Sequence, residues 1–466
     1  MKLPEDFCQR MKDLLADCEV PEEGFFESFD TPSVGGLRFS RSKTYPGEEE
    51  KILKELGDEI KPVPWCDGGF YTNFEFPGKT PYYHAGVYYP QEPSAMLPAQ
   101  VLNARPGEYI LDMCAAPGGK ACRIGEDLKG QGLLVANEIN YNRSKALMRN
   151  IERSGITNCV ILNETPENIA ANLPGFFDKV LIDAPCSGEG MFRRDPQAVK
   201  SYIKFGPQTC VPIQKQILES AAKLLKPGGE IVYSTCTFGR AEDEDMILGF
   251  MQSHPEFKAV PHTEFEGVTR SKILPGAMRI WPHLTDGDGH FCVHLKKSGE
   301  LEETPTLEVS KISLKQDVLK LCTDFASDIL NEPALERFTK ISPYLTCKGS
   351  AISLKTFDDS PFSRLNIVKS GLFAAEIKTS GKKVFEPSNS LALALSAEDL
   401  RSDSVADFSA SELYLQKYLK GETLPVPEGM KDKGYVVVCV AGHPLGFGKV
   451  QGGQIKNLYP KAWRLL

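Results

Sequence analysis

The stretch EYILDMCAAPGGK, residues 108–120, joins an apolar run to a loop of small residues and then to an amphipathic segment. This order predicts a β-strand that turns tightly into an α-helix. Glycine and alanine allow a ligand to come close to the backbone, and the first N–H groups of a helix have no partner within it. We therefore expect residues Leu111 to Lys120 to form a ligand-binding loop that suits a carboxylate and a sugar.

Two other kinds of nucleotide-binding loop do not fit this stretch. A phosphate-binding P-loop needs GxxxxGK followed by serine or threonine, but Ala121 follows Lys120 here. The dinucleotide fingerprint GxGxxG is absent. A strand-to-helix turn with a purely structural role remains the alternative.

Apolar runs alternate with amphipathic segments after this loop, as in the β-α-β units that build a parallel sheet. We expect strands at residues 108–114, 132–139, 158–164, 179–185 and 230–236, and helices at 142–155 and 214–229. Gly228 and Gly229 are expected to end the second helix. Two further strands, at 276–283 and 290–297, suit a sheet whose last strand is antiparallel. The pattern predicts a doubly wound α/β fold.

The composition limits the classes to which the chain can belong. Its 466 residues are enough for about three domains. The hydrophobic fraction of 41% and the charged fraction of 25% are ordinary for a water-soluble protein, and no apolar run approaches the roughly 20 residues of a membrane span. The N-terminus lacks the unbroken apolar core of a signal peptide, so we expect a cytoplasmic protein without a membrane partner.

Cysteine and charge content exclude further classes. The 13 cysteines include no CxxC pair, which argues against a disulfide framework and a structural zinc site, and we expect no metal. The net charge of −8 excludes a uniformly basic nucleic-acid-binding protein but not a local basic face.

Changes of pattern along the chain predict four parts. Residues 1–95 are rich in turn-forming and aromatic residues and are expected to form a small α+β domain, followed by a catalytic domain at 96–298. The polar stretch SGELEETPTLEVS from Ser298 is typical of a linker, and residues 299–385 are expected to hold this linker and an intermediate domain. Residues 386–466 are expected to form a compact β-rich domain.

Two cysteines lie where strands are expected to end. Asp183-Ala-Pro-Cys186 ends the fourth strand and Ser-Thr-Cys236 ends the fifth. Ligands of open parallel sheets bind at the carboxyl ends of the strands, so both thiols should face the cleft beside the glycine-rich loop. Glu138 follows that loop by about 20 residues, at the place where a carboxylate binds ribose hydroxyls in nucleotide-binding sheets.

Two thiols in such a cleft indicate attack on a pyrimidine. Carbon 5 of cytosine is a poor nucleophile, but thiolate addition at carbon 6 enables it to attack an electrophilic methyl group. The carbon 5 proton and the thiolate must then leave, which gives the second cysteine a role, while Asp183 could hold the amine or N3 edge of the base. The alternatives are buried, inert cysteines and an amino-group methyltransferase, which usually has Asp/Asn-Pro-Pro-Tyr at the fourth strand.

Five motifs are spaced along residues 84–298. They are HAGVYYPQEPSAM from His84, DMCAAPGGK from Asp112, NEINYNR from Asn137, IDAPCSGEGMFRRDP from Ile182 and YSTCTF from Tyr233. Together they resemble the Sun/NSUN family of RNA cytosine-5 methyltransferases. The resemblance implies a Rossmann-like class I methyltransferase sheet, with a small α+β N-terminal domain and a C-terminal PUA-like β-rich domain, and S-adenosyl-L-methionine as the cofactor.

The resemblance also implies roles for single residues. Cys236 would be the nucleophile and Cys186 would assist release, with Asp183 and Lys120 as further catalytic residues beside the base. Cofactor contacts are implied for Cys114, Ala115, Ala116, Pro117, Gly118, Gly119, Lys120, Glu138, Arg143 and Asp183. Many relatives contact the adenine through an acidic residue at the end of strand three. By register Thr165 takes that place here, and Glu164 competes with it.

The outer parts of the chain resemble the domains that flank the catalytic domain in family members acting on small-subunit ribosomal RNA. The implied partner is therefore RNA, namely small-subunit (16S) ribosomal RNA or the 30S subunit. DNA is not implied, because DNA cytosine-5 methyltransferases use the Pro-Cys cysteine as the nucleophile. Two alternatives stay open: a tRNA cytosine-5 methyltransferase, and a non-catalytic RNA-binding factor of ribosome assembly.

Overall fold

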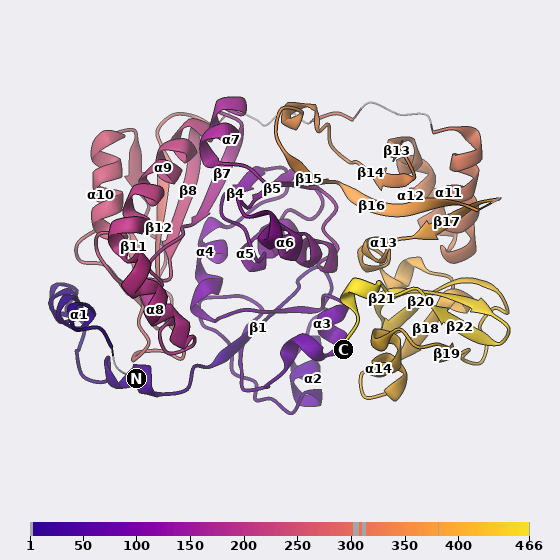
Figure 1. The fold of residues 1–466 in the computed structure, drawn as a ribbon, viewed down its shortest axis with the longest axis horizontal. Coiled ribbons are helices and arrows are strands. Elements are labelled where there is room, and N and C mark those ends of the chain that lie inside the picture. The colour runs from indigo at the N-terminus through magenta and orange to yellow at the C-terminus, as the bar shows by residue number, and fades with distance from the viewer. Residues whose placement is uncertain (1–2, 302–306, 310–313, 381, 466) are drawn as a thin grey trace.

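A mixed ten-stranded sheet forms the centre of the molecule (Figure 1). The structure is a computed structural model and describes residues 3–301, 307–309, 314–380 and 382–465. The strands of this sheet are β4 (Tyr109–Asp112), β5 (Leu133–Asn137), β6 (Cys159–Leu162), β7 (Phe177–Asp183), β8 (Leu225–Thr235), β9 (Phe257–Ala259), β10 (Val268–Arg270), β11 (Ala277–Ile280), β12 (His290–Lys297) and β15 (Ile367–Ser370). Their order is β10-β11-β12-β8-β7-β4-β5-β6-β15, and β9 pairs with β12.

Five central strands, β6, β5, β4, β7 and β8, run parallel, and β12 pairs antiparallel with β8. The predicted strands, the doubly wound sheet and its antiparallel last strand are thereby confirmed. Strand β4 lies between β5 and β7, so the chain leaves β4 in both directions of the sheet. Such a switch point opens a crevice at the carboxyl ends of the strands.

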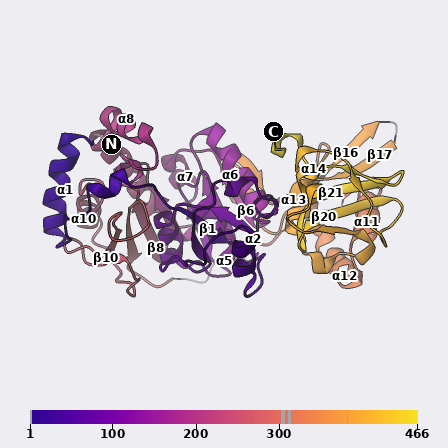
Figure 2. The same cartoon turned by 90° about the horizontal axis from the view of Figure 1, so that it is seen from below.

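Helices cover both faces of the sheet (Figures 1 and 2). They are α4 (Leu97–Leu102), α5 (Gly119–Asp127) and α6 (Tyr141–Arg153) on one face, and α7 (Pro166–Asn172), α9 (Pro207–Leu224) and α10 (Glu244–Ser253) on the other, with α8 (Pro196–Phe205) beside them. Alternate strand residues enter separate cores, with Leu111, Val135 and Val160 in one and Ile110, Leu134 and Ile161 in the other. Strands buried on both faces explain the continuous apolar runs in the sequence.

Both predicted bounds of the second helix are wrong, and α9 begins at Pro207 and not at residue 214. Gly228 and Gly229 do not end the helix before β8, because α9 stops at Leu224 and β8 begins at Leu225. The glycines instead lie in the first part of the strand, where a Cβ on Gly229 would meet the carbonyl oxygen of Asp178 at 3.0 Å. Close approach of neighbouring backbones, and not helix termination, accounts for glycine there.

The N-terminal part combines a small sheet with a helix that lies apart from it. Its elements are α1 (Glu5–Asp17), β1 (Gly35–Phe39), α2 (Glu48–Glu55), β2 (Gly69–Thr72), α3 (Pro81–His84) and β3 (Tyr88–Pro90), with strand order β2-β1-β3. Helix α1 lies at the far side of the central sheet, beyond α8 and α10 (Figure 1). Its Phe7 and Met11 share a core with Phe192, Phe238 and Trp281 of the catalytic part.

The C-terminal part holds two further sheets and lies at the opposite end of an elongated molecule (Figure 2). Its elements are α11 (Gln316–Ile329), α12 (Glu332–Ile341), β13 (Leu345–Lys348), β14 (Ala351–Leu354), β16 (Leu372–Ser380), β17 (Lys382–Pro387), α13 (Asn389–Ala394), β18 (Val405–Phe408), α14 (Leu413–Lys420), β19 (Leu424–Pro425), β20 (Gly434–Val440), β21 (His443–Gln451) and β22 (Gln454–Asn457). The sheet orders are β13-β14-β16-β17 and β18-β20-β21-β22-β19.

Chain segments far apart in sequence hold these parts together. Of the linker predicted from Ser298, residues 302–306 and 310 lie outside the described residues. Strand β15 extends the central sheet by pairing antiparallel with β6. The N-terminal sheet shares a core with the last sheet, where His84 Nδ1 lies 2.7 Å from the Tyr459 hydroxyl oxygen. In the described ranges, no helix combines the length and apolarity that crossing a bilayer demands.

Candidate active site

The loop between β4 and α5 lies at the switch point, and α6 holds its shape. Arg143 donates to the carbonyl oxygen of Ala116 at 2.8 Å, and Asn150 donates to that of Pro117 at 2.7 Å. Gly118 has φ of +121°, and a Cβ there would lie 3.2 Å from Leu147. Only glycine adopts this conformation readily, so Gly118 allows the tight turn into α5. The sequence-predicted ligand loop is thus a defined backbone feature at the carboxyl end of β4.

Two buried carboxylates flank the loop. Asp112 ends β4 and is 1% exposed, yet neither carboxylate oxygen makes a hydrogen bond within the described part of the chain. Its burial, together with the charge of Asp183, raises the pKa of Asp112 to about 7. Glu138, just after β5, is also buried; it accepts from the N–H of Asn140 at 2.8 Å and lies 3.3 Å from Arg143. These acceptors suit a ligand with an ammonium group and sugar hydroxyls.

Asp183, at the end of β7, lies at the centre of a polar cluster. It forms an ion pair with Lys120 Nζ at 2.8 Å and accepts from Ser234 Oγ at 2.9 Å. His290 Nε2 lies 3.6 Å from the same carboxylate. Burial alone would raise the pKa of Asp183, but Lys120 and His290 outweigh it and hold this pKa well below its usual range. Asp183 is therefore a carboxylate, and Lys120, whose pKa is raised, is an ammonium.

The thiols of Cys186 and Cys236 meet beside this cluster. Their sulfur atoms lie 3.4 Å apart, and both residues are partly exposed. The hydrogen bond with Cys236, reinforced by burial, raises the pKa of Cys186 well above the ordinary thiol value. Cys186 therefore retains its proton at neutral pH, and either sulfur can be the donor in the hydrogen bond between them. Both thiols lie at the sheet edge where the sequence places them.

Thr165 and Glu164, at the end of strand three, both make hydrogen bonds within the chain. Thr165 is the N-cap of α7, and its hydroxyl oxygen accepts from the N–H of Asn168 at 3.2 Å. Both carboxylate oxygens of Glu164 are engaged, one with the Asn168 side chain at 2.8 Å and one with the N–H of Asn366 at 2.7 Å. Asn366 directly precedes β15, so Glu164 ties the added strand to the sheet.

Several groups around the site escaped the sequence analysis. Glu189 lies within the motif that begins at Ile182, and Glu242 lies just after the motif that begins at Tyr233. Nothing in the sequence indicates that both side chains are fully buried. Glu189 accepts from the N–H groups of Phe238 and Gly239 at 3.0 Å each and pairs with Arg10 of α1 at 2.7 Å. Helix α1 is thereby linked, through Glu189, to the loop that carries Cys236. The signal that could have found these carboxylates is burial, which needs the tertiary structure.

All 13 cysteines are free thiols. Within residues 3–301, 307–309, 314–380 and 382–465, no cluster of histidine, cysteine, aspartate and glutamate has the size to hold a metal ion.

The fold and the site define a Rossmann-like methyltransferase. A methyltransferase homolog from Pyrococcus horikoshii matches 63% of this chain and 95% of its own chain, with 28% identity and a TM-score of 0.54. NSun6 from the same organism, solved with SFG, matches 64% of this chain and 99% of its own with a TM-score of 0.55; at 20% identity it supports the fold alone.

Comparison along the whole chain identifies the family. Residues 99–296 match the model of 16S rRNA methyltransferase RsmB/F, residues 3–93 that of the N-terminal domain of RsmF, and residues 406–465 that of the RsmF PUA domain. Ribosomal RNA small subunit methyltransferase F of Vibrio cholerae is 30% identical over 99% of this chain and 97% of its own length. The Shewanella baltica protein is 29% identical over 94% and 92%. The chain belongs to the ribosomal RNA small subunit methyltransferase F family.

Proposed function

We propose that this protein methylates carbon 5 of a cytosine in 16S ribosomal RNA, with S-adenosyl-L-methionine as the methyl donor and a covalent bond between Cys236 and carbon 6 of the base. The observation that carries the proposal is the pair of thiols 3.4 Å apart beside the Lys120–Asp183 ion pair. A methyltransferase acting on oxygen or on an amino group has no use for two thiols at this place.

The cofactor assignment rests on the chemistry of the loop and on the family. We assign its contacts to Cys114–Lys120, Glu138, Arg143 and Asp183, with Thr165 or Glu164 near the adenine. The unpartnered carboxylate of Asp112 and the buried Glu138 suit the ammonium and ribose hydroxyls of S-adenosylmethionine. The NSun6 structure contains SFG, an analogue of this cofactor. When bound, S-adenosylmethionine supplies the electrophilic methyl group.

In the first half of the reaction, Cys236 and the Asp183 cluster act on the base. The Cys236 thiolate adds to carbon 6, and the electron pair of the carbon 5–carbon 6 double bond moves toward carbon 5 and N3. The Asp183 carboxylate accepts a hydrogen bond from the exocyclic amine, while the Lys120 ammonium stabilises the negative charge that develops on the ring. A flipped base would be needed to reach these groups from a stacked RNA.

In the second half, Cys186 assists release. After carbon 5 has bonded to the methyl group, with the pair of the former sulfur–methyl bond remaining on the donor sulfur, the Cys186 thiolate would take the carbon 5 proton. The electrons of that bond re-form the carbon 5–carbon 6 double bond, and the bond between carbon 6 and Cys236 breaks with its electron pair returning to sulfur. The hydrogen bond with Cys236 is the main cause that raises the pKa of Cys186. Once Cys236 is bonded to carbon 6, this cause is removed, so Cys186 ionises more readily at the stage where a base is required.

The RNA assignment rests on the RsmF-type flanking domains, including the PUA domain at residues 406–465. The substrate is 16S ribosomal RNA, free or within the 30S subunit, and the cytoplasm, where ribosomes are assembled, is the corresponding location.

Methyl-labelled S-adenosylmethionine tests this function. The protein is incubated with 16S RNA, 30S subunits or bulk tRNA, and the labelled nucleoside is identified after digestion. We expect 5-methylcytidine from 16S RNA or 30S subunits. Label in tRNA alone would redirect the substrate to tRNA, label in another nucleoside would overturn the chemistry, and no label in any arm would indicate a binding factor without catalysis.

A further inference from the structure

A buried carboxylate connects the two loops that carry the thiols. Glu242 is 0% exposed. One of its carboxylate oxygens accepts from the backbone N–H of Ser187 at 2.9 Å, and the other from the Ser187 hydroxyl at 2.5 Å. The Ser187 hydroxyl oxygen also lies 2.8 Å from the hydroxyl oxygen of Thr237. Ser187 and Thr237 directly follow Cys186 and Cys236. The carboxylate therefore contacts the neighbour of one thiol directly and is linked to the neighbour of the other through the Ser187 hydroxyl.

The same carboxylate also holds the residue that precedes Cys186. The Gln214 side-chain amide of α9 donates to Glu242 and to the carbonyl oxygen of Pro185, at 3.0 Å each. Glu242 is therefore connected to both sides of the Cys186 loop and, through Ser187, to the Cys236 loop.

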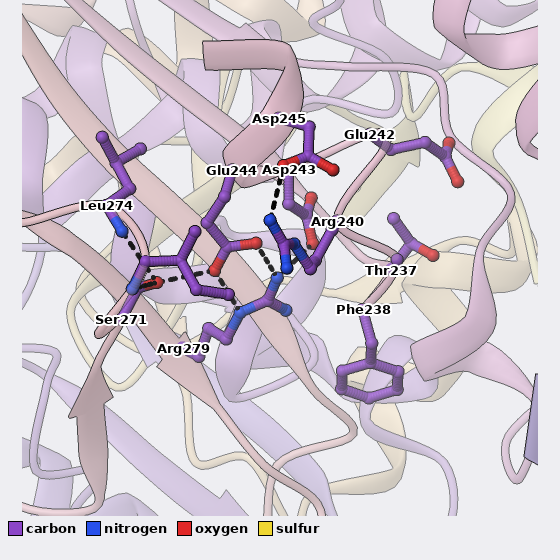
Figure 3. Close-up of polar contacts among 12 residues, drawn as sticks. Thr237, Phe238, Arg240, Glu242, Asp243, Glu244, Asp245, Ser271, Leu274 and Arg279 are labelled. Atoms are coloured by element: carbon purple, nitrogen blue, oxygen red, sulfur yellow. Dashed lines mark hydrogen bonds and ion pairs between the residues drawn. The ribbon is translucent and has the colours of Figure 1, made fainter. Parts of the chain in front are cut away.

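Charge balance does not explain why an acid is buried here. Among the described residues Glu242 forms no ion pair, and burial raises its pKa against the effect of the Ser187 hydrogen bonds. Its neighbours Asp243 and Glu244 do pair with Arg279, at 3.0 Å for Asp243. Figure 3 shows Glu242 on the side of Thr237, away from the Arg279 cluster. An unpaired buried acid is costly, and here it provides acceptors for Ser187 of the Cys186 loop and for Gln214 of α9.

We propose that Glu242 is a positioning residue that sets the separation of the Cys186 and Cys236 thiols. The effect of Glu242 on the reaction rests on the proposed function, because only a reaction that uses both thiols requires this separation. Without the carboxylate, the Ser187 hydroxyl and the Gln214 amide lose the acceptor that holds them, so the Ser187–Thr237 link is no longer fixed. The other hydrogen bonds between the loops, such as that from the N–H of Gly190 to the carbonyl oxygen of Cys236, remain. Misplacement of reacting groups by about 1 Å can cost on the order of 100-fold in rate.

The distance between the thiols can be measured without RNA or cofactor. Dibromobimane joins two neighbouring thiols and fluoresces when both of its arms have reacted, and peptide mapping identifies the Cys186–Cys236 cross-link. Glu242→Leu removes the acceptors while keeping a similar volume, and we expect this cross-link to form at least about tenfold more slowly. In Glu242→Gln the Ser187 hydroxyl can reverse its role, so we expect most of the wild-type rate to return.

A matched control separates positioning from general loss of stability. Glu244→Gln weakens the buried Arg279 pair in the same turn but touches neither thiol loop, so it should lower the unfolding midpoint and leave cross-linking unchanged. Ser187→Ala removes the hydroxyl that joins Glu242 to Thr237 but keeps the backbone N–H that donates to Glu242. It serves if Glu242→Leu does not fold, and it should also slow the cross-link. Wild-type cross-linking in Glu242→Leu or Ser187→Ala, or equal slowing in Glu244→Gln, overturns the proposal.

Single-turnover methylation adds a second readout. Because release needs Cys186 beside the adduct, Glu242→Leu should raise the ratio of RNA trapped on the protein to RNA released. If Glu242→Leu were only less stable, the amounts of trapped RNA and of released RNA would fall by the same factor. That result would count against a positioning role. If wild-type protein cross-links normally but methylates no cytosine, the proposed function fails while the positioning role stands.

Discussion

The sulfur atoms of Cys186 and Cys236 lie 3.4 Å apart although 50 residues separate them in the chain. Strands β7 and β8 are parallel neighbours, and Asp183 is paired in register with Ser234. Cys186 follows Asp183 by three residues and Cys236 follows Ser234 by two. The two thiols therefore leave the same edge of the sheet at nearly the same level, and the loops between them and the strands complete the approach.

Substitution of the two cysteines should have unequal effects. Cys236→Ala should abolish methylation and form no adduct, because no thiol then adds to carbon 6. Cys186→Ala should still form the adduct but release product slowly, so that RNA accumulates on the protein in denaturing gels. The double variant should resemble Cys236→Ala. A trapped complex that requires Cys186 and not Cys236 would reverse the assigned roles.

Loss of the charge on Asp183 should reduce the rate of methylation. Asp183→Asn keeps the shape but weakens both the ion pair with Lys120 and the acceptor for the base amine, and we expect kcat to fall on the order of 100-fold. The depressed pKa leaves wild-type Asp183 ionised from neutral pH down past its ordinary value, so it should produce no loss of activity between pH 8 and 5.

Steady-state rates with saturating RNA, measured for both proteins between pH 8 and 5, test the fall in kcat of Asp183→Asn and the constant activity of the wild type. The ionised Asp183 also contributes to the free energy of unfolding. This contribution is fully present above the unfolded pKa of the carboxyl group and is lost only as pH falls through the lowered folded pKa. An acid limb that appears in the wild type and vanishes in Asp183→Asn would contradict the assignment.

The buried Asp112 should make stability depend on pH in the opposite direction. Its folded pKa of about 7 lies above the unfolded value, so the folded state binds the proton more tightly and stability falls as pH rises toward 7. Asp112→Asn should remove this slope. The difference in free energy of unfolding between variant and wild type should grow by on the order of 2 kcal/mol from pH 5 to pH 7 in urea titrations. If the free energies of unfolding of the two proteins changed in parallel with pH, the pKa of Asp112 would not be raised by folding.

Substitutions of Thr165 distinguish a helix cap from a cofactor contact. Thr165→Ala removes the acceptor for the N–H of Asn168 and should lower the free energy of unfolding by about 1 kcal/mol, and Thr165→Ser should restore it. If the cap is its sole role, calorimetry should give the same Kd for S-adenosylmethionine in all three proteins. Weaker binding by Thr165→Ala that Thr165→Ser recovers would place its hydroxyl in the cofactor site, and Glu164→Gln tests the competing residue.

The central sheet could be predicted because its signals are local. Apolar runs such as 132–139 and 158–164 alternate with amphipathic helices, and a strand buried on both faces must be apolar throughout. The end of α9 could not be predicted in the same way. Gly228 and Gly229 have a helix-stop pattern, but the approach of neighbouring backbones decides their conformation, and that approach is a tertiary contact.

The amino-acid sequence by itself determined the sheet, the loop at Leu111 to Lys120 and the strand ends that carry the two cysteines, because spacing and residue type encode them within short stretches. Only the tertiary structure decided that Glu242 connects the thiol loops, that Arg10 of the first helix pairs with Glu189, and that β15 returns to the sheet. Acidic residues and short strands look alike in sequence whether exposed or buried. Their partners, supplied by distant segments, give them their roles.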